Sequence, residues 1–572
     1  MSARAGRQGR RADWILALVA LLVLGAGLGL RDPWPSDEPR FALVAKHMVE
    51  SGDWLFPRRG TELYADKPPL LMWAQAAIHQ LTGEWRIAFL LPSLLAALGT
   101  LGCVYDLGRR LWSPPVGRYA AWALLLTMQF AFQAKRAQID PLVVFWITLA
   151  NWALLRHLLV GRDWRLWALG WAAAGLGTIT KGVGALALLM LLPASFAALA
   201  GWGRVRLDLR NPRFWFGPLA FVAAIAIWLA PMLAVALNHA DPGYRDYVRE
   251  ILFQQTAHRY AQSWNSQQPP WYFAGVIATL WLPTALLLPL AIAPWRRRLA
   301  RRDPRYLLPL AWVALVLVFF SIPAGKRDVY ILPALPMLCL ALAPLLPGLV
   351  RRPGVRRLAF AFTAVVAVPM LAAGLAIGFG EPAFERKLVA ERGLVGGTGL
   401  LAAALCGIGL VGWLALAVGR LKGAIPALAA TLATLWIAVG LAIAPLANDA
   451  ASGRGVMAAV EARLAPDDEL AIVAWKEQML FMAARPATTF GFATRWSEQL
   501  ARAMAWQAER PGTRWLLVQE AALTACIDRA RAQRIGLANR RHWWLVPSDA
   551  VPDPGCRIVG IESQNQADGQ DD

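Results

Sequence analysis

Long apolar segments constrain the fold of this chain more than any other feature. The runs 14–30 and 214–237 are long enough for an α-helix to cross about 30 Å of hydrocarbon, which takes roughly 17 to 25 residues. Hydrophobic residues make up 57% of the 572 residues and charged residues only 17%, whereas soluble domains carry about 25% charged residues. We therefore expect a polytopic membrane protein built mainly from helices.

Thirteen segments have the length and apolarity of a membrane span. They lie near residues 14–30, 86–108, 115–133, 141–160, 164–180, 183–200, 214–237, 272–293, 305–322, 329–349, 358–379, 396–418 and 425–446. The apolar segment 68–81 has only about 14 residues and is expected to form a re-entrant or interfacial helix. Because thirteen is an odd number, the two termini are expected on opposite sides of the membrane.

The positive charge of the chain, +21 in total, is concentrated in short segments between the expected spans. Arginine clusters lie at 204–213, 296–302 and 351–357, and short loops rich in Lys and Arg mark the cytoplasmic side of bilayer proteins. With the N-terminus in the cytoplasm, all three clusters fall on that side. Membrane topology thus accounts for the charge, and we do not expect nucleic acid as a partner.

Two adjacent carboxylates, Asp37 and Glu38, follow the first span on the external side. Carboxylates are costly to desolvate beside a membrane, so the pair indicates a chemical role. Other acidic and cationic residues fall on the same side: Arg40, Asp66, Lys67, Asp140, Arg259, Lys326 and Arg327. Fixed cations stabilise the charge of a departing phosphate, and carboxylates orient a sugar or assist its acceptor. The set indicates chemistry on a charged lipid, such as sugar transfer from a polyprenyl phosphate.

Several of these residues also have a purely structural explanation. Asp37 and Glu38 could cap the helix that follows them. Asp140, which precedes Pro141, could cap the helix expected at 141–160. Lys67 could extend along the membrane surface as a snorkelling lysine. A solvated charge pair or an interfacial anchor would explain three further residues: Lys326, Arg327 and Tyr330.

A divalent metal is the one cofactor that the external residues could hold. His258 lies next to Arg259 in the sequence, and it could join Asp66 or Glu38 around zinc or manganese. Dense His or Cys spacings of the kind that mark metal sites do not occur. We therefore expect no required cofactor, with the metal as the open alternative.

The apolar character falls after residue 446, and residues 447–572 are expected to form a small soluble α/β domain. Strands are predicted at 469–475, 514–520 and 542–547, with helices at 455–464, at 497–510 and between the last two strands. The polar residues 562–572 are expected to be disordered. Cys526 and Cys556 both lie in this domain, where an oxidising compartment would permit a disulfide; two free thiols are the alternative.

Four short motifs follow one another in the external segments. DEPRF begins at Asp37, GDW at Gly52, YADKP at Tyr64, and SIPAGKRDVYILP at Ser321. In this order the motifs resemble bacterial aminoarabinose transferases that modify lipid A, which belong with protein O-mannosyltransferases among the polyprenyl-phosphate-dependent glycosyltransferases of the GT-C type. The resemblance covers the chain from Asp37 to about Pro333.

The resemblance implies an architecture and a location. It implies an all-α membrane domain of about 13 transmembrane helices over residues 1–446, with residues 31–85 as the first periplasmic loop. The protein would lie in the bacterial inner membrane with its N-terminus in the cytoplasm. Residues 447–572 would form a periplasmic α/β domain.

The resemblance also implies roles for individual residues. Asp37 would be the principal active-site carboxylate with Glu38 beside it, and Asp140 would be a second acidic residue of the site. The lipid-linked phosphate of the donor would be held by Arg40, Tyr64, Lys67, Arg259, Lys326 and Tyr330.

The implied donor is undecaprenyl phosphate carrying 4-amino-4-deoxy-L-arabinose, and the implied acceptor is a phosphate of lipid A or a related envelope component. A phosphate is already a nucleophile, so Asp37 would orient the acceptor or meet the amine of the sugar. Asp66 stands where these transferases usually carry Glu, and Pro39 where they often carry Thr, which leaves the particular sugar and acceptor open. The alternatives are a protein O-mannosyltransferase, whose hydroxyl acceptor would need Asp37 as a base, and a lipid or solute transporter.

Overall fold

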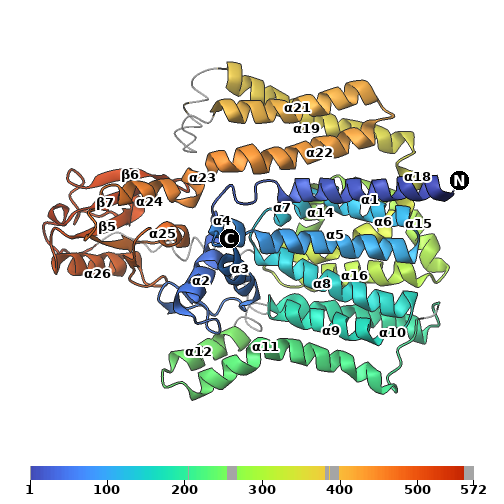
Figure 1. Cartoon of the computed structure of the whole chain (residues 1–572), viewed down its shortest axis with the longest axis horizontal. Helices are drawn as coiled ribbons and strands as arrows, with labels where there is room; N and C mark the ends of the chain where they lie inside the picture. Colours follow the sequence, from blue (N-terminus) through green and yellow to red (C-terminus); the bar gives the residue numbers. More distant parts are fainter. Residues whose placement is uncertain (1, 204, 254–266, 381–385, 387–397, 559–572) are drawn as a thin grey trace.

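The computed structural model describes the chain except for residues 1, 204, 254–266, 381–385, 387–397 and 559–572. Long helices lie side by side and form a bundle, and a smaller unit that contains a sheet lies at one end of it (Figure 1). The N-terminus lies at the opposite end of the bundle. The two ends of the bundle are therefore structurally different.

Helices account for the whole bundle. Its principal elements are α1 (Ser2–Gly25), α5 (Leu91–Leu111), α6 (Pro114–Leu126), α7 (Met128–Ala134), α8 (Ile139–Leu155), α9 (Trp164–Thr178), η2 (Gly182–Met190), α10 (Leu191–Leu199), α11 (Phe216–Asn238), α14 (Tyr272–Leu280), α15 (Leu288–Ala300), α16 (Pro304–Ser321), η6 (Asp328–Ala334), α17 (Leu335–Leu342), α18 (Leu346–Leu349), α19 (Pro353–Phe379), α21 (Thr398–Gly419), α22 (Ala424–Ala438) and α23 (Ala444–Ser452).

Nine helical segments within the described part of the chain are long and apolar enough to cross a membrane. They are Trp85–Leu111, Ile139–Val160, Gly182–Leu199, Pro212–Asn238, Pro304–Ser321, Asp328–Leu349, Pro353–Phe379, Thr398–Gly419 and Ala424–Ser452. A tenth span is obtained if the bent pair Tyr272–Leu280 and Thr284–Ala300, which turns by 102°, is counted as one. All ten coincide with expected spans, which confirms a mainly helical, multi-pass membrane protein.

The remaining three expected spans, at 14–30, 115–133 and 164–180, fall on helices that do not meet the same criteria. α1 ends at Gly25, and its first half carries arginines. The second segment is divided at Thr127 into α6 and α7. α9 has only 15 residues. A count of thirteen spans therefore remains a proposal.

Close helix packing in the bundle depends on small residues. A Cβ atom added to Gly108 of α5 would lie 2.8 Å from the Cα atom of Gly117 in α6, and one added to Gly117 would lie 2.4 Å from the carbonyl oxygen of Tyr105. Both distances are shorter than a carbon contact allows. Glycine at these positions lets the two backbones touch, as is common between membrane helices.

Residues 31–85, called the first external segment after their expected location, fold into short elements against the end of the bundle. These are α2 (Glu38–Ser51), the two-stranded hairpin of β1 (Arg58–Arg59) and β2 (Glu62–Leu63), α3 (Leu70–Thr82) and α4 (Trp85–Ala88). The segment expected as a re-entrant or interfacial helix is α3, with 13 residues. It shares a buried apolar cluster with α2 that includes Phe41, Met48, Leu71 and Met72.

The C-terminal unit is built on a mixed five-stranded sheet. Its elements are α24 (Arg454–Glu461), β3 (Glu469–Val473), α25 (Glu477–Met482), β4 (Ala487–Thr488), α26 (Trp496–Ala508), β5 (Arg514–Gln519), β6 (Gln533–Ala538) and β7 (Arg541–Val546). The strand order is β4-β3-β5-β7-β6, with β3 parallel to both β4 and β5, and β7 antiparallel to both β5 and β6. The three predicted strands and the first two predicted helices of this region are confirmed.

The third predicted helix, between 520 and 542, is wrong. The segment contains only a three-residue 3-10 helix, Glu520–Ala522, and then β6, which pairs with β7. Asn539 and Arg540 join the two strands with φ values of 47° and 61°. Two successive left-handed residues form the turn that matches the twist of a hairpin, and this local geometry favours strand pairing.

Cys526 and Cys556 are joined by a disulfide bond. The sequence left a bridge and two free thiols as alternatives, and the structure shows the bridge. Cys526 is buried in the apolar cluster between α26 and the sheet, so the bond ties the end of the unit to its core. The residues 562–572, which we expected to be disordered, lie outside the described part of the chain.

The C-terminal unit is attached to the bundle by an apolar core and by a buried charge. One apolar cluster joins Leu43 and Phe89 to Met457, Trp475 and Met479 of the C-terminal unit. The charge is the carboxylate of Asp32, which is only 1% exposed. It accepts hydrogen bonds from Arg86 Nε (2.9 Å), Arg454 Nε (2.5 Å) and Asn448 Nδ2 (2.7 Å). These contacts fix the unit against the first external segment.

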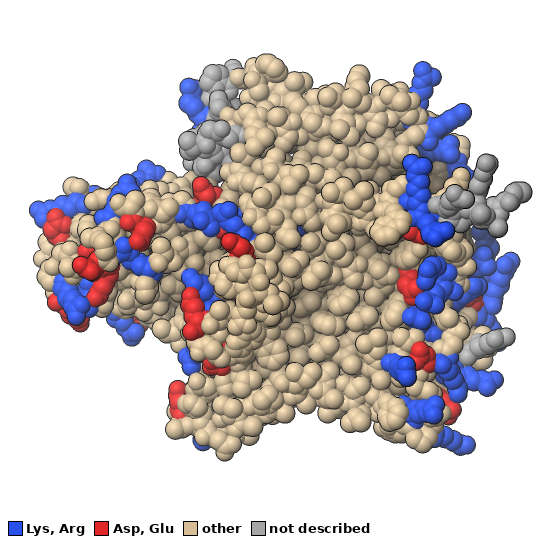
Figure 2. Space-filling model, viewed as in Figure 1, with Lys and Arg blue, Asp and Glu red and all other residues tan. Residues whose placement is uncertain are grey.

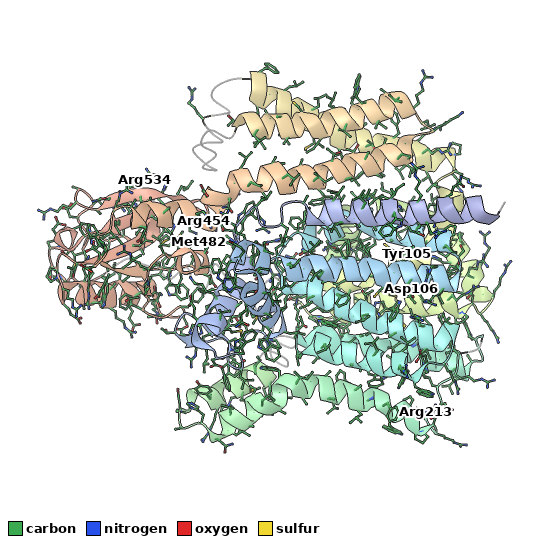
Figure 3. The ribbon with its side chains drawn as sticks, viewed as in Figure 1. Tyr105, Asp106, Arg213, Arg454, Met482 and Arg534 are labelled. Carbon is green, nitrogen blue, oxygen red and sulfur yellow. A yellow bond between two sulfur atoms is a disulfide. The ribbon has the colours of Figure 1, made fainter. Side chains whose placement is uncertain are left out.

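The distribution of charge agrees with a membrane around the middle of the bundle. Figure 2 shows a broad band without charged side chains, bordered at the N-terminal end by Lys and Arg and at the other end by the charged C-terminal unit. Arg213, from the arginine cluster 204–213, lies at the opposite end of the molecule from Arg454 and Arg534 (Figure 3). The expected separation of this cluster from the external segments is therefore seen in the fold.

Candidate functional site

A cavity of about 1310 Å³ lies where the bundle meets the C-terminal unit. Its walls come from the first external segment, the ends of several bundle helices, and the C-terminal unit. The cavity has an apolar part and a charged part, which are built from different elements.

Helices of the bundle form the apolar part. α8, η2, α11 and α16 contribute Val143, Ile147, Leu186, Trp228, Leu229, Val316, Phe319 and Phe320. Each of these elements belongs to a segment that can span a membrane. An apolar wall on membrane-spanning helices is suited to a hydrocarbon chain.

Ionisable side chains crowd the other part of the cavity. Among the described residues, its cations are Arg40, Arg59, Lys67, Arg136, Lys181, Arg327, Lys476 and Arg541, and its carboxylates are Asp37, Asp66, Asp140, Asp328 and Glu477. The cations outnumber the carboxylates by three. An excess of positive charge in a partly enclosed space attracts anionic ligands.

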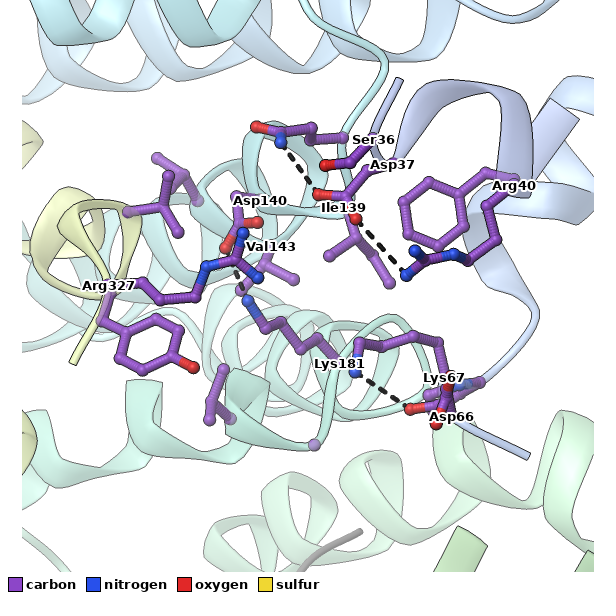
Figure 4. Close-up of a pocket in the computed structure, with 18 of the residues that line it drawn as sticks. Ser36, Asp37, Arg40, Asp66, Lys67, Ile139, Asp140, Val143, Lys181 and Arg327 are labelled. Carbon is purple, nitrogen blue, oxygen red and sulfur yellow. Dashed lines mark hydrogen bonds and ion pairs between the residues drawn. The ribbon is translucent and has the colours of Figure 1, made fainter. Parts of the chain in front are cut away.

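Asp37 directs its carboxylate into this charged part (Figure 4). It occupies the N-cap position of α2, yet its side chain makes no capping hydrogen bond. The carboxylate instead accepts a hydrogen bond from Gln138 Nε2 at 2.9 Å and lies 3.6 Å from Arg40 Nη1. The capping explanation therefore does not account for Asp37.

Glu38 points away from the cavity and is 2% exposed. Its oxygens accept hydrogen bonds from Arg31 Nη2 at 2.7 Å, from the Trp34 backbone at 2.9 Å and from the Ala137 backbone at 2.9 Å. Burial alone would raise its pKa, but the charge and hydrogen bonds of Arg31 and the two backbone donors outweigh burial and lower the pKa. This placement corrects the expectation that Glu38 is a catalytic residue beside Asp37: it anchors the loop that carries Asp37.

Asp140 forms an ion pair with Lys181, with 2.7 Å between Oδ1 and Nζ. Asp140 lies in the first turn of α8, and Lys181 lies immediately before η2. The ammonium of Lys181 is also 5.3 Å from the ring centre of Tyr330. All three residues line the cavity, so this part of the predicted site is assembled around a lysine that we did not predict.

Lys181 could have been found from the sequence. Lys181 is the only charged residue between the expected spans 164–180 and 183–200. The count of spans that places the other charged segments on the external side of the membrane places this short connection there as well. A lone cation between two apolar runs of a membrane protein is a functional candidate by itself.

Tyr64, Asp66 and Lys67 lie together on the wall that the first external segment contributes. Tyr64 is 3% exposed, and its hydroxyl makes no hydrogen bond to any described residue. Burial and the nearby Asp66 carboxylate raise its pKa, so the hydroxyl keeps its proton and can donate it to a ligand oxygen. Lys67 Nζ donates to the carbonyl oxygen of Asp66 at 3.0 Å, and both side chains reach the cavity near Lys181 (Figure 4).

Lys326 is turned away from the cavity. It is 3% exposed, and its ammonium donates to the carbonyl oxygens of Pro323 at 2.7 Å and Gln268 at 3.2 Å. This corrects the expectation that Lys326 binds the donor phosphate: it holds the loop in shape. The next residue, Arg327, lines the cavity and reaches toward Asp140 (Figure 4).

The C-terminal unit contributes a carboxylate that the sequence analysis missed. Glu477, the first residue of α25, accepts a hydrogen bond from Arg40 Nε at 3.2 Å and lies 3.7 Å from Arg59 Nη1. It is 5% exposed and lines the cavity. No sequence signal pointed to it, because the motifs end more than a hundred residues earlier.

Two predicted residues fall in the range 254–266. Arg259, a candidate for phosphate binding, and His258, a candidate metal ligand, both lie outside the described residues. Within the described ranges, no group of three or more His, Cys, Asp or Glu residues could hold a metal ion.

Comparisons with known proteins give one family match and several similar relatives. The family model described as dolichyl-phosphate-mannose-protein mannosyltransferase matches residues 66–230, which include Lys67, Asp140 and Lys181. The undecaprenyl phosphate-α-4-amino-4-deoxy-L-arabinose arabinosyl transferase of Pseudomonas savastanoi pv. phaseolicola is 31% identical over 58% of this chain and 61% of the relative. The enzyme of the same name from Pectobacterium carotovorum subsp. carotovorum is 31% identical over 64% of this chain and 65% of the relative.

The chain also resembles a solved structure over almost its full length. The crystal structure of ArnT from Cupriavidus metallidurans bound to undecaprenyl phosphate has a TM-score of 0.73 and 21% sequence identity, covering 94% of this chain and 99% of that one. This likeness shows that the two share a fold. The sequence matches described above confirm the predicted resemblance to aminoarabinose transferases. The sequence matches span less than two thirds of the length of the two relatives just described.

Proposed function

We propose that this protein is a membrane glycosyltransferase that transfers 4-amino-4-deoxy-L-arabinose from undecaprenyl phosphate to lipid A or a related envelope acceptor. The cavity carries this proposal, because one part of its wall is apolar and lies on membrane-spanning helices while the other part is rich in cations. A polyprenyl phosphate has the matching two parts, a long apolar chain and an anionic head. The relatives named above are arabinosyl transferases that use undecaprenyl phosphate.

In the proposed complex, the polyprenyl chain lies against α8, η2, α11 and α16. Its phosphate meets Lys181 at the start of η2, Lys67 and Arg327 in the adjoining loops, and the hydroxyl of Tyr64. Tyr330 lies beside Lys181 and would face the same phosphate. Cations fixed in a partly dehydrated site stabilise the charge that develops on a departing phosphate.

The proposed reaction breaks the bond between the anomeric carbon and the donor phosphate oxygen, which leaves with the bonding electron pair. An oxygen of the acceptor phosphate attacks the anomeric carbon from the opposite face and inverts its configuration. This oxygen is already ionised, so no general base is needed. Asp37 orients the acceptor and stabilises positive charge on the sugar, and Asp140 keeps Lys181 in place through their ion pair.

The proposed topology places the cavity on the periplasmic face of the bacterial inner membrane. Thirteen spans would put the N-terminus in the cytoplasm and the C-terminal unit in the periplasm. The concentration of Lys and Arg at the N-terminal end of the bundle (Figure 2) supports this orientation through the positive-inside rule. The domains would be 1–446 and 447–572, although the last long helix continues to Ser452.

The family model that matches residues 66–230 favours a second candidate, a protein O-mannosyltransferase. Its acceptor would be a serine or threonine hydroxyl, which must lose a proton during attack. Asp37 would then be the general base, and the rate would fall as Asp37 becomes protonated. A phosphate acceptor does not impose that requirement.

Transfer by the purified protein is the first expected result. We expect that protein in lipid, given undecaprenyl-phosphate aminoarabinose and lipid A, increases the mass of lipid A by one aminoarabinose residue while undecaprenyl phosphate appears. Mass spectrometry of both lipids measures this. A mannosylated peptide from a polyprenyl-phosphate mannose donor would support the second candidate. Tight binding of the donor without cleavage of any sugar donor would contradict both and indicate a transporter.

Removing the cation that bridges Asp140 and Tyr330 should weaken donor binding. We expect Lys181→Met to raise the dissociation constant for undecaprenyl phosphate by about 10- to 100-fold, as a charged hydrogen bond is worth about 1.5–3 kcal/mol. Lys181→Arg keeps the charge and should recover part of the affinity. Arg110→Gln, an exposed arginine outside the cavity lining, is the control. Unchanged affinity in Lys181→Met would remove Lys181 from the donor site.

A further inference from the structure

We infer that the C-terminal unit holds the acceptor, with Lys476 and Arg541 binding a phosphate monoester of the acceptor lipid. This inference rests on the proposed function, because it names the second of the two phosphates that the transfer requires. Both residues line the cavity, and no motif or matched family region reaches them.

The fold holds both cations in fixed positions. Lys476 immediately precedes α25, which packs against α2. Arg541 is the first residue of β7, and its Nη1 donates to Gln519 Oε1 at 3.3 Å. The adjoining hairpin turn is held by a hydrogen bond from the Asn539 backbone to the carbonyl oxygen of Ala450 in α23, at 2.7 Å.

The position of these cations separates them from the donor. Lys181 and Arg327 immediately precede η2 and η6, which belong to membrane-spanning segments. A phosphate on a chain among those spans therefore meets Lys181 and Arg327 first. Lys476 and Arg541 belong to the unit that lies beyond the end of the bundle (Figure 1), so they face the cavity from its other side.

Charge balance supports a second anion at this wall. Glu477 compensates part of the charge of Arg40 and Arg59, which it contacts directly. Among the described residues, the cations that line the cavity outnumber the carboxylates by three, more charge than a single phosphate neutralises. Two phosphates close to one another repel strongly in a medium of low dielectric constant. Separate groups of cations would let donor and acceptor bind at the same time.

Binding experiments with the full-length protein in lipid nanodiscs test this assignment. The variants are Lys476→Gln and Arg541→Gln, and the control is Arg540→Gln, an exposed arginine that does not line the cavity. The probes are lipid A, enzymatically dephosphorylated lipid A, and undecaprenyl phosphate. We expect each cavity variant to weaken lipid A binding by about 10-fold or more. Undecaprenyl phosphate affinity should stay within about two-fold and thereby report an intact fold. Lys476→Arg should restore lipid A binding.

The outcomes separate this inference from the proposed function. If dephosphorylated lipid A binds the unaltered protein as tightly as lipid A, or if both variants keep full lipid A affinity, the inference is overturned. A parallel loss of undecaprenyl phosphate affinity would assign the two cations to the donor and overturn it as well. If lipid A binds through Lys476 and Arg541 but no sugar is transferred, the proposed function fails and the binding site stands.

Discussion

Asp37→Asn is expected to reduce transfer by at least about 10³-fold, the combined loss expected for a group that both orients a reactant and stabilises charge in the transition state. The asparagine side chain has nearly the same size but lacks the negative charge. It can still accept the hydrogen bond from Gln138, so the loop should keep its conformation. The initial rate of aminoarabinose transfer to lipid A, measured at saturating donor, is the readout.

The matched control for this variant lies on the same helix. Glu50→Gln removes a carboxylate that is 62% exposed and does not line the cavity, and it should transfer at the normal rate. Binding of undecaprenyl phosphate should be retained in both variants. If Asp37→Asn kept more than a tenth of the rate, Asp37 would not be the principal carboxylate of the site.

Arg31→Met is expected to destabilise the protein by about 3–5 kcal/mol, because it leaves the buried charge of Glu38 without its partner. Arg31 binds Glu38 through both terminal nitrogens, and the pair is almost inaccessible to solvent. The free energy of unfolding is measured in detergent by thermal or denaturant unfolding. The double variant Arg31→Met/Glu38→Leu should recover much of the stability, since it removes both charges.

The destabilisation should depend on pH in a defined direction. The pKa of Glu38 is below its ordinary value of 4.5, so the pair stabilises the fold fully above that pH and loses its contribution as the pH falls further. The difference between normal and Arg31→Met protein should therefore shrink in acid. Glu50→Gln, which removes an ion pair with Lys46 from its exposed side, should change stability by less than about 1 kcal/mol. An equal effect of both substitutions would contradict a structural role for the Arg31–Glu38 pair.

The sequence predicts the membrane-spanning helices well because their cause is local. Ten of the expected spans coincide with helices of sufficient length, since apolarity over about 20 residues can be read directly from the chain. Apolarity alone does not locate the break at Thr127 between α6 and α7 or the 102° bend between α14 and η5 (Thr284–Leu287). Pro283, immediately before η5, is a local signal for that bend, because proline interrupts a helix.

The sequence predicts part of the candidate site, and the residues that were predicted wrongly share a common cause. Asp37 and Asp140 line the cavity as expected, because their topology and motifs place them at helix starts on one side. Glu38 follows Asp37 and Lys326 precedes Arg327, yet the side chains of Glu38 and Lys326 point away from the cavity. Successive residues project in different directions along a helix or turn, so a charged pair in the sequence does not share one environment. Glu477 was missed because its contact with Arg40 joins residues 437 positions apart.

Residues from both ends of the sequence line the cavity. Asp37 lies near the beginning of the sequence and Arg541 near its end, yet both side chains line the same cavity. A chain that has inserted all its spans still lacks Glu477, whose carboxylate holds Arg40 and Arg59. The cavity is therefore complete only when the C-terminal unit, with its disulfide, is folded and its Arg454 is bound to Asp32.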